Sequence, residues 1–197
     1  FKILILGGSQ GAHSINLGII EALDFLSDRK NNLHITHQTG EADYKYIKNQ
    51  YCEKGFDANV MSFITDMHLQ YRLASLVICR SGATTIAEIT AAGRVSALIP
   101  FPYAANNHQE HNARIIETAN AGEVILDSEI SGERLAKSIT RAMDEPENLQ
   151  KMEDNSYQLG SRDATEKVRK ICEDLMKNKS NKSKSNNLSK EKIMSCF

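Results

Sequence analysis

The sequence carries almost no net charge, which argues against one large class of partners. Its 197 residues hold 24 basic and 25 acidic side chains, a formal net charge of −1. A global basic field that would attract nucleic acid is therefore lacking, and we expect no nucleic-acid partner. The charge is unevenly spread: residues 177–197 contain six lysines and one acid, whereas the rest of the chain holds 18 basic and 24 acidic side chains.

Paired cysteines and long apolar runs are also lacking. The four cysteines form no CxxC pair, and their spacing suits neither zinc nor a disulfide framework. We therefore expect a reducing, cytoplasmic compartment. No apolar run approaches the roughly 18 residues that would cross a bilayer, and no signal peptide is visible. Because the chain opens at Phe1 directly into an apolar segment, without an initiator methionine, we expect it to have been cut from a longer protein.

What the sequence does have is an alternation of short apolar runs with longer segments of helical period. Several of the short runs are continuously apolar, as strands covered on both faces should be. The repetition predicts an α/β fold with a parallel, doubly wound sheet and helices on both faces. The predicted strands are 2–6, 33–37, 58–62, 76–79, 95–99 and 123–126. The predicted helices are 12–27, 41–53, 66–73, 83–92 and 107–120, followed by 131–144, 146–159 and 163–177.

The last twenty residues have a different composition. Residues 178–197 are dominated by Asn, Ser and Lys and hold too few apolar side chains to bury a core, so we expect a disordered tail. We expect one folded domain over residues 1–177. A basic tail could contact acidic lipid, but a solvated extension explains the composition equally simply.

In open parallel sheets, ligands bind outside the carboxyl ends of the strands. The first loop of this kind is "GGSQGAHSIN", residues 7–16, where two glycines permit close approach of a ligand and a helix start offers free N–H groups. Ser9 and Gln10 add polar groups. The stretch is neither GxGxxG nor a P-loop, so a phosphate site and a plain strand-to-helix turn both stay open.

The second loop is "CRSGATTIAEITAAG", residues 79–93. Ser81 is expected as the N-cap of a helix that starts at Gly82 and ends near Gly93. A diphosphate could sit on the first N–H groups, and Glu88 follows roughly 9 Å along the helix axis, where it could accept bonds from ribose hydroxyls. A solvated Glu88 is the alternative. Ala87, Ala91 and Ala92 are expected on the buried side.

Two further loops carry candidate groups. In "PFPYAANNHQEHNAR", residues 100–114, His108 and Gln109 could bind sugar hydroxyls, although surface polarity also explains them. The pair His108 and His111 lacks a third ligand, so we expect no metal site. In "SFITDM", residues 62–67, Ile64 could pack beneath a flat base while its backbone contacts the base edge, and Asp66 is expected as an N-cap.

These stretches, together with "HQTG" and a late "DAT", follow one another in the order found in a known family. Over residues 1–177 the chain resembles the carboxy-terminal half of the MurG family, the bacterial N-acetylglucosaminyltransferases of peptidoglycan synthesis. The resemblance implies a GT-B fold, with two Rossmann-like domains and the active site between them. It further implies that this chain is the domain that binds UDP-N-acetylglucosamine, at the cytoplasmic face of the inner membrane.

The resemblance also implies roles for single residues. Ser9 matches a serine near the diphosphate, Ile64 a residue whose backbone contacts uracil, and Gln109 a glutamine that contacts the sugar. His108 stands where some members have a further glutamine. The segment that matches the phosphate-binding and ribose-binding helix start, with Glu88 on the ribose hydroxyls, consists of Ala83, Thr84, Thr85, Ile86, Ala87 and Glu88.

The family's amino-terminal domain has no counterpart in this sequence. Inversion at the anomeric carbon needs a base that deprotonates the acceptor hydroxyl, and we expect that base, and the contacts to the lipid-linked acceptor, on the missing domain or a partner chain. No cofactor is expected, although a divalent cation could join the diphosphate. Two alternatives stay open: a soluble donor subunit of a split, dolichol-type transferase, and a non-catalytic nucleotide-sugar binding module.

Overall fold

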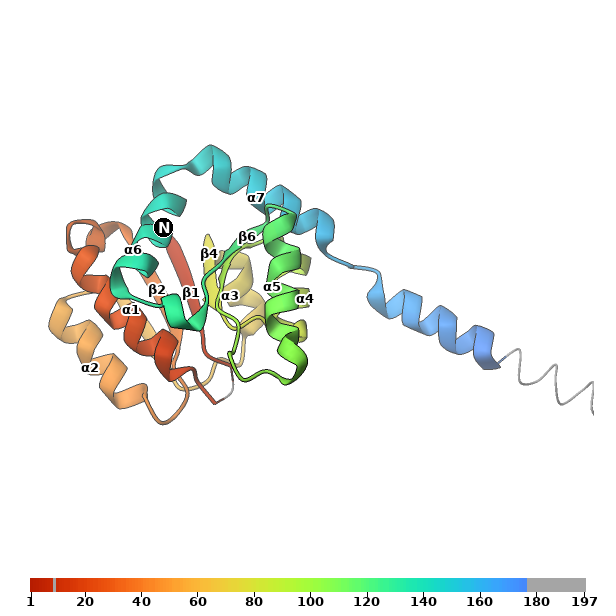
Figure 1. Ribbon diagram of the computed structural model, residues 1–197, viewed down its shortest axis with the longest axis horizontal. Helices are drawn as coiled ribbons and strands as arrows, with labels where there is room; N and C mark the ends of the chain where they lie inside the picture. The colour runs from red at the N-terminus through yellow and green to blue at the C-terminus, as the bar shows by residue number, and fades with distance from the viewer. Residues whose placement is uncertain (9, 177–197) are drawn as a thin grey trace, which may run out of the picture. The chain divides into compact units, whose positions relative to one another are not determined.

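A computed structural model describes residues 1–8 and 10–176 of the chain (Figure 1). The strands are β1 (Lys2–Leu6), β2 (His34–Gln38), β3 (Ala58–Met61), β4 (Leu76–Cys79), β5 (Val95–Leu98) and β6 (Gly122–Val124). The α-helices are α1 (His13–Phe25), α2 (Tyr44–Lys54), α3 (Met67–Leu73), α4 (Ala83–Ala92), α5 (His108–Thr118), α6 (Gly132–Asp144) and α7 (Pro146–Leu159), and a further helix covers 164–176. Three short 3-10 helices are η1 (Ser27–Asn32), η2 (Ala105–Asn107) and η3 (Asp127–Glu129).

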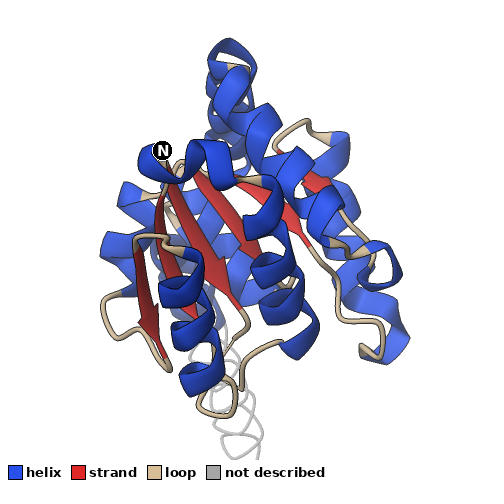
Figure 2. Cartoon of the chain, turned by 90° about the vertical axis from the view of Figure 1, so that its left-hand side faces the viewer, coloured by secondary structure: helices blue, strands red, loops and turns tan. Residues whose placement is uncertain are grey.

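The six strands form one parallel sheet in the order β3-β2-β1-β4-β5-β6 (Figure 2). The chain winds outward from β1 to β3 and then returns to β4 on the other side of β1, so the direction of winding reverses between β1 and β4. Leu6 stands beside both Gln38 and Cys79 in the register, which aligns the carboxyl ends of β1, β2 and β4. The predicted α/β doubly wound fold is thus confirmed, with its switch point at the β1–β4 edge.

Helices cover both faces of the sheet. Helices α1, α2 and α6 lie on one face and α3, α4 and α5 on the other (Figure 1). Alternate residues of β1 enter the two cores, with Ile3 and Ile5 on the α1 side and Leu4 and Leu6 on the α4 side. This two-sided burial explains why the strand sequences are continuously apolar, because each residue faces one of two buried layers.

The predicted boundaries of the strands and helices agree closely with those in the structure. Two residues that begin or end a helix illustrate why. Pro146 is the first residue of α7, where its missing N–H costs no helical hydrogen bond. Gly93 ends α4 with φ +63°, a left-handed conformation that glycine adopts without strain. The 3-10 helix over Ser27–Asn32 was not predicted, because its polar sequence SDRKNN has no apolar period.

Two expectations about α4 are wrong. The N-cap is Gly82 rather than Ser81, whose side chain is fully buried and turned to α5. The buried face is formed by Ile89 and Thr90, whereas Ala87 and Ala91 are exposed and Ala92 is half-buried. The helix therefore packs through its larger side chains and presents its small ones to solvent.

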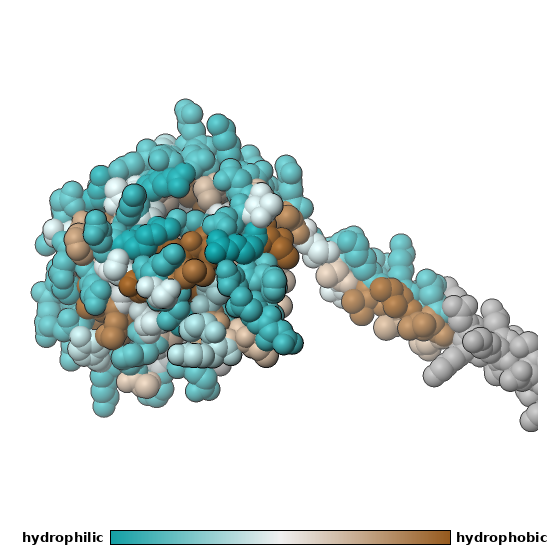
Figure 3. All heavy atoms as spheres, in the orientation of Figure 1, coloured by the Kyte–Doolittle hydropathy of each residue, from teal (hydrophilic) through white to brown (hydrophobic). Residues whose placement is uncertain are grey.

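The chain divides into two compact units, Phe1–Gly160 and Ser161–Phe197. In the second unit the helix over 164–176 is almost wholly exposed and carries a row of apolar side chains, seen in Figure 3 as brown spheres. These side chains are Val168, Ile171, Leu175 and Met176. The expected tail over residues 178–197 lies outside the described residues. Among those that are described, no helix has the length and apolar content to cross a bilayer.

Candidate functional site: two hollows beside helix α4

A large hollow of about 680 Å³ opens at the carboxyl ends of β1, β4 and β5. Loops that are distant in the sequence meet here, as the position of the switch point requires. The hollow is lined by Gly7, Gly8, Gln10, Gly11, Ala12, His13, Ser14, Arg80, Gly82, Thr85, Phe101, Pro102, Tyr103, Gln109 and Asp127. Four of the predicted binding residues, Gln10, Gly82, Thr85 and Gln109, are thereby brought together.

The glycines of the first loop are required by the fold itself. A Cβ on Gly7 would meet Ala12 N at 2.2 Å, and one on Gly11 would meet Thr39 O at 2.2 Å. Gly8 and Gly11 also have φ of +78° and +80°. The loop is therefore pressed against the β2 end, which shows that a tight structural turn is present whether or not a ligand binds. Ser9 lies outside the described residues, and Gln10 is exposed at the rim.

Gln38, at the end of β2, ties two of the predicted loops together. Its buried side-chain amide donates from Nε2 to Gly8 O at 2.8 Å, while its Oε1 accepts from Ile64 N at 2.9 Å. Ile64 itself is 3% exposed. The backbone N–H of Ile64 is therefore already engaged with Gln38.

A buried polar chain lies behind these loops. His37 is fully buried, with Nδ1 3.0 Å from Tyr51 Oη and Nε2 3.0 Å from Asn16 Oδ1. Asn16 donates from Nδ2 to Thr39 O and to Asp43 Oδ2. Since Oδ1 of Asn16 can only accept, His37 is protonated at Nε2, and its Nδ1 accepts from Tyr51. Burial lowers the pKa of His37 to about 3, which keeps the ring neutral.

This buried chain ends at an exposed histidine that the sequence did not single out. His13, the first residue of α1, lines the large hollow and places Nδ1 3.0 Å from Asp43 Oδ2. Burial alone raises the pKa of Asp43, but the hydrogen bonds from His13 and Asn16 outweigh it, and the pKa of Asp43 is lowered. The pair was missed, although His13 lies in the quoted stretch GGSQGAHSIN, because its partners are thirty residues apart and only the fold brings them together.

Arg80, also missed, joins four loops beneath the large hollow. Its Nη1 donates to Asp127 Oδ1 at 2.6 Å and to the carbonyls of Ile99 and Pro100, and its Nη2 donates to Ser14 Oγ at 2.9 Å. The Arg80 guanidinium also lies over the Phe101 ring, 5.5 Å from its centre. Only a planar, multiply donating group can serve all of these partners at once.

The start of α4 contributes N–H groups rather than side-chain caps. Among the described residues no side chain accepts from the first turn, so within this part of the chain the first N–H groups of α4 have neither an intrahelical nor a capping acceptor. Ala83 and Thr84 are exposed, while Thr85 and Ile86 are half-buried. Ser81 donates its hydroxyl to Gln109 O at 2.8 Å and accepts, at its own carbonyl, from Asn112 Nδ2, which holds α5 against this loop.

Helix α5 presents Gln109 to the large hollow. Gln109 Oε1 accepts from Phe101 N at 3.0 Å, which fixes the amide and leaves its Nε2 hydrogens without an acceptor among the described residues. His108 Nδ1 lies 2.8 Å from Ala105 O, so it donates there and its Nε2 is left as an acceptor. Before α5 the loop turns through Asn106 and Asn107, both with positive φ.

Glu88 is not in the large hollow but in a second one between α3 and α4, which we call the α3–α4 hollow. It has a volume of about 270 Å³ and is lined by Met67, His68, Tyr71, Glu88, Ala91 and Ala92. Tyr71 Oη donates to Glu88 Oε2 at 3.1 Å. Helix α4 therefore contributes to both hollows, with Gly82 and Thr85 in the large one and Glu88 in the other.

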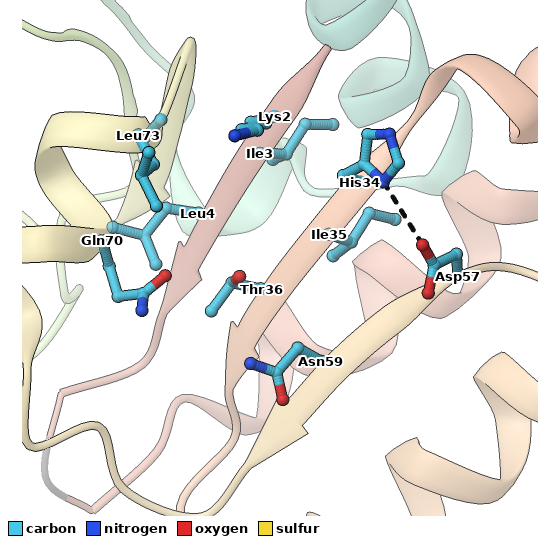
Figure 4. A pocket seen from close by; sticks show the side chains of 11 residues that line it. Lys2, Ile3, Leu4, His34, Ile35, Thr36, Asp57, Asn59, Gln70 and Leu73 are labelled. Atoms are coloured by element: carbon cyan, nitrogen blue, oxygen red, sulfur yellow. Dashed lines mark hydrogen bonds and ion pairs between the residues drawn. The ribbon is translucent and has the colours of Figure 1, made fainter.

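A third hollow, of about 260 Å³, lies against the sheet beside α3, toward the amino ends of β1 and β2 (Figure 4). Lys2, Thr36, Asn59 and the ion pair of His34 with Asp57 line it. It contains none of the predicted binding residues and lies away from the carboxyl edge of the sheet. Within the described part of the chain, no group of three or more His, Cys, Asp or Glu side chains could hold a metal ion.

The sheet order, the switch-point hollow and the helix start beside it define a Rossmann-like domain. The chain belongs to the family described as the glycosyltransferase family 28 C-terminal domain, which matches residues 2–175. The fold expected from the sequence resemblance is thereby confirmed, as is the family itself.

Similar proteins support this assignment. The chain is 50% identical over 177 residues to the UDP-N-acetylglucosamine–N-acetylmuramyl-(pentapeptide) pyrophosphoryl-undecaprenol N-acetylglucosamine transferase of Thermodesulfovibrio yellowstonii, a match that covers 90% of the chain and 48% of that protein. The protein of the same name from Myxococcus xanthus is 44% identical, with 89% and 46% covered. The crystal structure of Acinetobacter baumannii MurG matches with a TM-score of 0.78 and 31% identity, over 86% of this chain and 48% of that one. The chain thus spans about half the length of the relatives it matches.

Proposed function

We propose that this chain binds UDP-N-acetylglucosamine as the donor half of an N-acetylglucosaminyltransferase. The acceptor would be N-acetylmuramyl-(pentapeptide) pyrophosphoryl-undecaprenol, as the names of the two curated relatives state for those proteins. The observation that carries the proposal is the position of α4, whose uncapped first turn belongs to the large hollow and whose Glu88 belongs to the α3–α4 hollow.

A nucleotide sugar would lie across the start of α4. Glu88 follows Gly82 by about 9 Å along the helix axis, a length that a ribosyl diphosphate spans. The uridine would occupy the α3–α4 hollow, with the carbonyl of Ile64 at the base edge and Glu88 at the ribose hydroxyls. The diphosphate would accept from the N–H groups of Ala83 and its neighbours, because an anion is stabilised at a helix N-terminus.

The sugar would then reach the large hollow. Gln109 Nε2 is available as a donor there, because Oε1 of the same amide accepts from Phe101 N. Gln10 and His108 would lie at the rim of the same proposed site, and Ser9, which lies outside the described residues, keeps the role near the diphosphate that the resemblance implies. Ser81, fully buried, would serve by holding α5 and thereby Gln109, rather than by touching the ligand.

In such a transfer the donor half stabilises the leaving UDP while the acceptor hydroxyl is deprotonated elsewhere. The N–H groups of α4 would supply charge stabilisation to the diphosphate as the glycosidic bond breaks. We place the base and the lipid contacts on an acceptor-binding half that these 197 residues do not contain, acting at the cytoplasmic face of the membrane. The chain alone is therefore expected to bind donor without transferring the sugar.

Calorimetric titration of the 197-residue chain tests this proposal. UDP-N-acetylglucosamine should bind more tightly than UDP, and Gln109→Ala should reduce this difference, because Gln109 is proposed to contact the sugar and not the nucleotide. Glu88→Ala should weaken UDP roughly tenfold or more, because a hydrogen-bonded charged group is worth about 1.5–3 kcal/mol. An unaltered UDP affinity in Glu88→Ala would contradict the ribose assignment, and a chain that binds no UDP would contradict the proposal as a whole.

A further inference from the structure

Tyr71 is a buried side chain whose single polar atom reaches a group proposed to bind ligand. It lies in the last turn of α3, is 4% exposed, and belongs to the same buried cluster as Ile64 and Ile89. Its hydroxyl donates to Glu88 Oε2 at 3.1 Å. Burial raises the pKa of Tyr71 well above its usual value, and the neighbouring Cys79 and Glu88 raise it further, so the phenol stays a donor.

Glu88 depends on such a partner because nothing else described in the structure holds it. It is an exposed residue on the second turn of α4, and its carboxylate has no hydrogen-bond donor other than Tyr71 among the described residues. A free glutamate side chain samples several rotamers, and fixing it on ligand binding costs conformational entropy. A rigid donor that fixes it beforehand removes much of that cost.

We propose that Tyr71 is a positioning residue for ribose recognition, holding the Glu88 carboxylate toward the cis-diol of a bound ribonucleotide. One carboxylate oxygen takes the Tyr71 hydrogen bond, and the other is left for a ribose hydroxyl. The inference rests on the proposed function, since it takes Glu88 as the ribose ligand. It adds that the preference for a ribonucleotide over a 2′-deoxyribonucleotide is set in part by a residue that need not touch the ligand.

The helix that carries Tyr71 also connects the proposed ribose site to the proposed base site. Helix α3 directly follows the loop that contains Ile64, and Met67 at its start lines the α3–α4 hollow together with Tyr71. The Tyr71–Glu88 bond therefore connects α4 to the element that would read the base. Ribose and base recognition would be aligned by one short helix.

The test compares Tyr71→Phe with a matched control, Tyr51→Phe. Tyr51 is the other buried tyrosine with one side-chain hydrogen bond, to His37 on the opposite face of the sheet. Both substitutions keep the ring and remove one hydroxyl, so both should fold, which thermal unfolding can verify. Affinities of the 197-residue chain for UDP and 2′-deoxy-UDP are measured for wild type and both variants.

Wild type should prefer UDP over 2′-deoxy-UDP. Tyr71→Phe should weaken UDP about three- to tenfold and 2′-deoxy-UDP less than about twofold, the range of one hydrogen bond, whereas Tyr51→Phe should leave the preference unchanged. On a Glu88→Ala background, Tyr71→Phe should cause no further loss of UDP affinity.

One result would overturn the role of Tyr71 while leaving the proposed function intact: an unchanged preference in Tyr71→Phe, whether both nucleotides bind as in wild type or both are weakened equally. A wild-type chain that binds neither nucleotide would overturn the proposed function and this inference with it.

Discussion

Acid should destabilise this fold through one buried histidine, and the size of the effect follows from the structure. His37 has a pKa of about 3 in the folded chain, against 6.5 for the exposed side chain. Between these values the unfolded chain takes up a proton that the folded chain does not. Stability from this residue is therefore complete above pH 6.5 and is lost as the pH falls toward 3.

The magnitude between pH 7 and pH 5 is about 2 kcal/mol. This magnitude is set mainly by the pKa of His37 in the unfolded chain, because pH 5 still lies above the pKa of His37 in the folded chain. The physical cause is that His37 Nδ1 accepts from Tyr51 and Nε2 donates to Asn16, so an added proton would break the first bond and leave a buried charge.

The assay is urea unfolding at pH 7 and pH 5 for wild type and His37→Gln. A glutamine amide can accept from Tyr51 and donate to Asn16 without titrating. Wild type should lose about 2 kcal/mol more than His37→Gln over this range. His34→Gln is the control, because the His34 side chain is 61% exposed, and it should behave as wild type. Equal pH dependence in wild type and His37→Gln would refute the reasoning.

Two further predictions address the large hollow. Arg80→Ala should lower the free energy of unfolding by about 2 kcal/mol, because it leaves the partly buried Asp127 carboxylate without its cation. Arg80→Lys should restore less than half of this loss. Urea unfolding measures the stability of both variants, and full rescue by lysine would contradict the proposal that Arg80 joins several loops. Gly11→Ala should destabilise the fold by several kcal/mol, because its Cβ would meet Thr39 O at 2.2 Å. In Gly8→Ala the new Cβ meets nothing within 4 Å, so this variant should lose only about 1–2 kcal/mol, for its positive φ. Comparable losses of stability in the two variants would show that the contact with Thr39 is not the reason for a glycine at position 11.

The fold was predictable because its signals are local. Continuously apolar strands, helical periods and a proline at the start of α7 each act within a few residues, and the order of elements then restricts the sheet to a doubly wound form. The wrong N-cap has a different origin. A serine before a glycine is a good cap in isolation, but the carbonyl of Gln109 on α5 takes the Ser81 hydroxyl instead. That partner is 28 residues away and cannot be read from the local sequence.

The sequence predicted which loops form the candidate site, but not which side chains hold those loops together. Gly82, Thr85 and Gln109 meet in one hollow, as loops at the ends of parallel strands should. Arg80 and Gln38 were missed, although both lie in quoted motifs, because their importance comes from bonding several loops at once. No spacing in the sequence predicts that an arginine or a glutamine will bond several loops. The separation of Glu88 into its own hollow likewise follows from the packing of α3 against α4.

The central claim is that a nucleotide sugar lies across the start of α4. The most direct measurement is the change in backbone amide NMR shifts when UDP-N-acetylglucosamine is added to the 197-residue chain. The account predicts the largest changes at Gly82–Thr85, with further changes at Glu88 and Gln109 and none around His34 and Asp57 in the hollow of Figure 4. Changes confined to that third hollow, with the amides at the start of α4 unmoved, would contradict it.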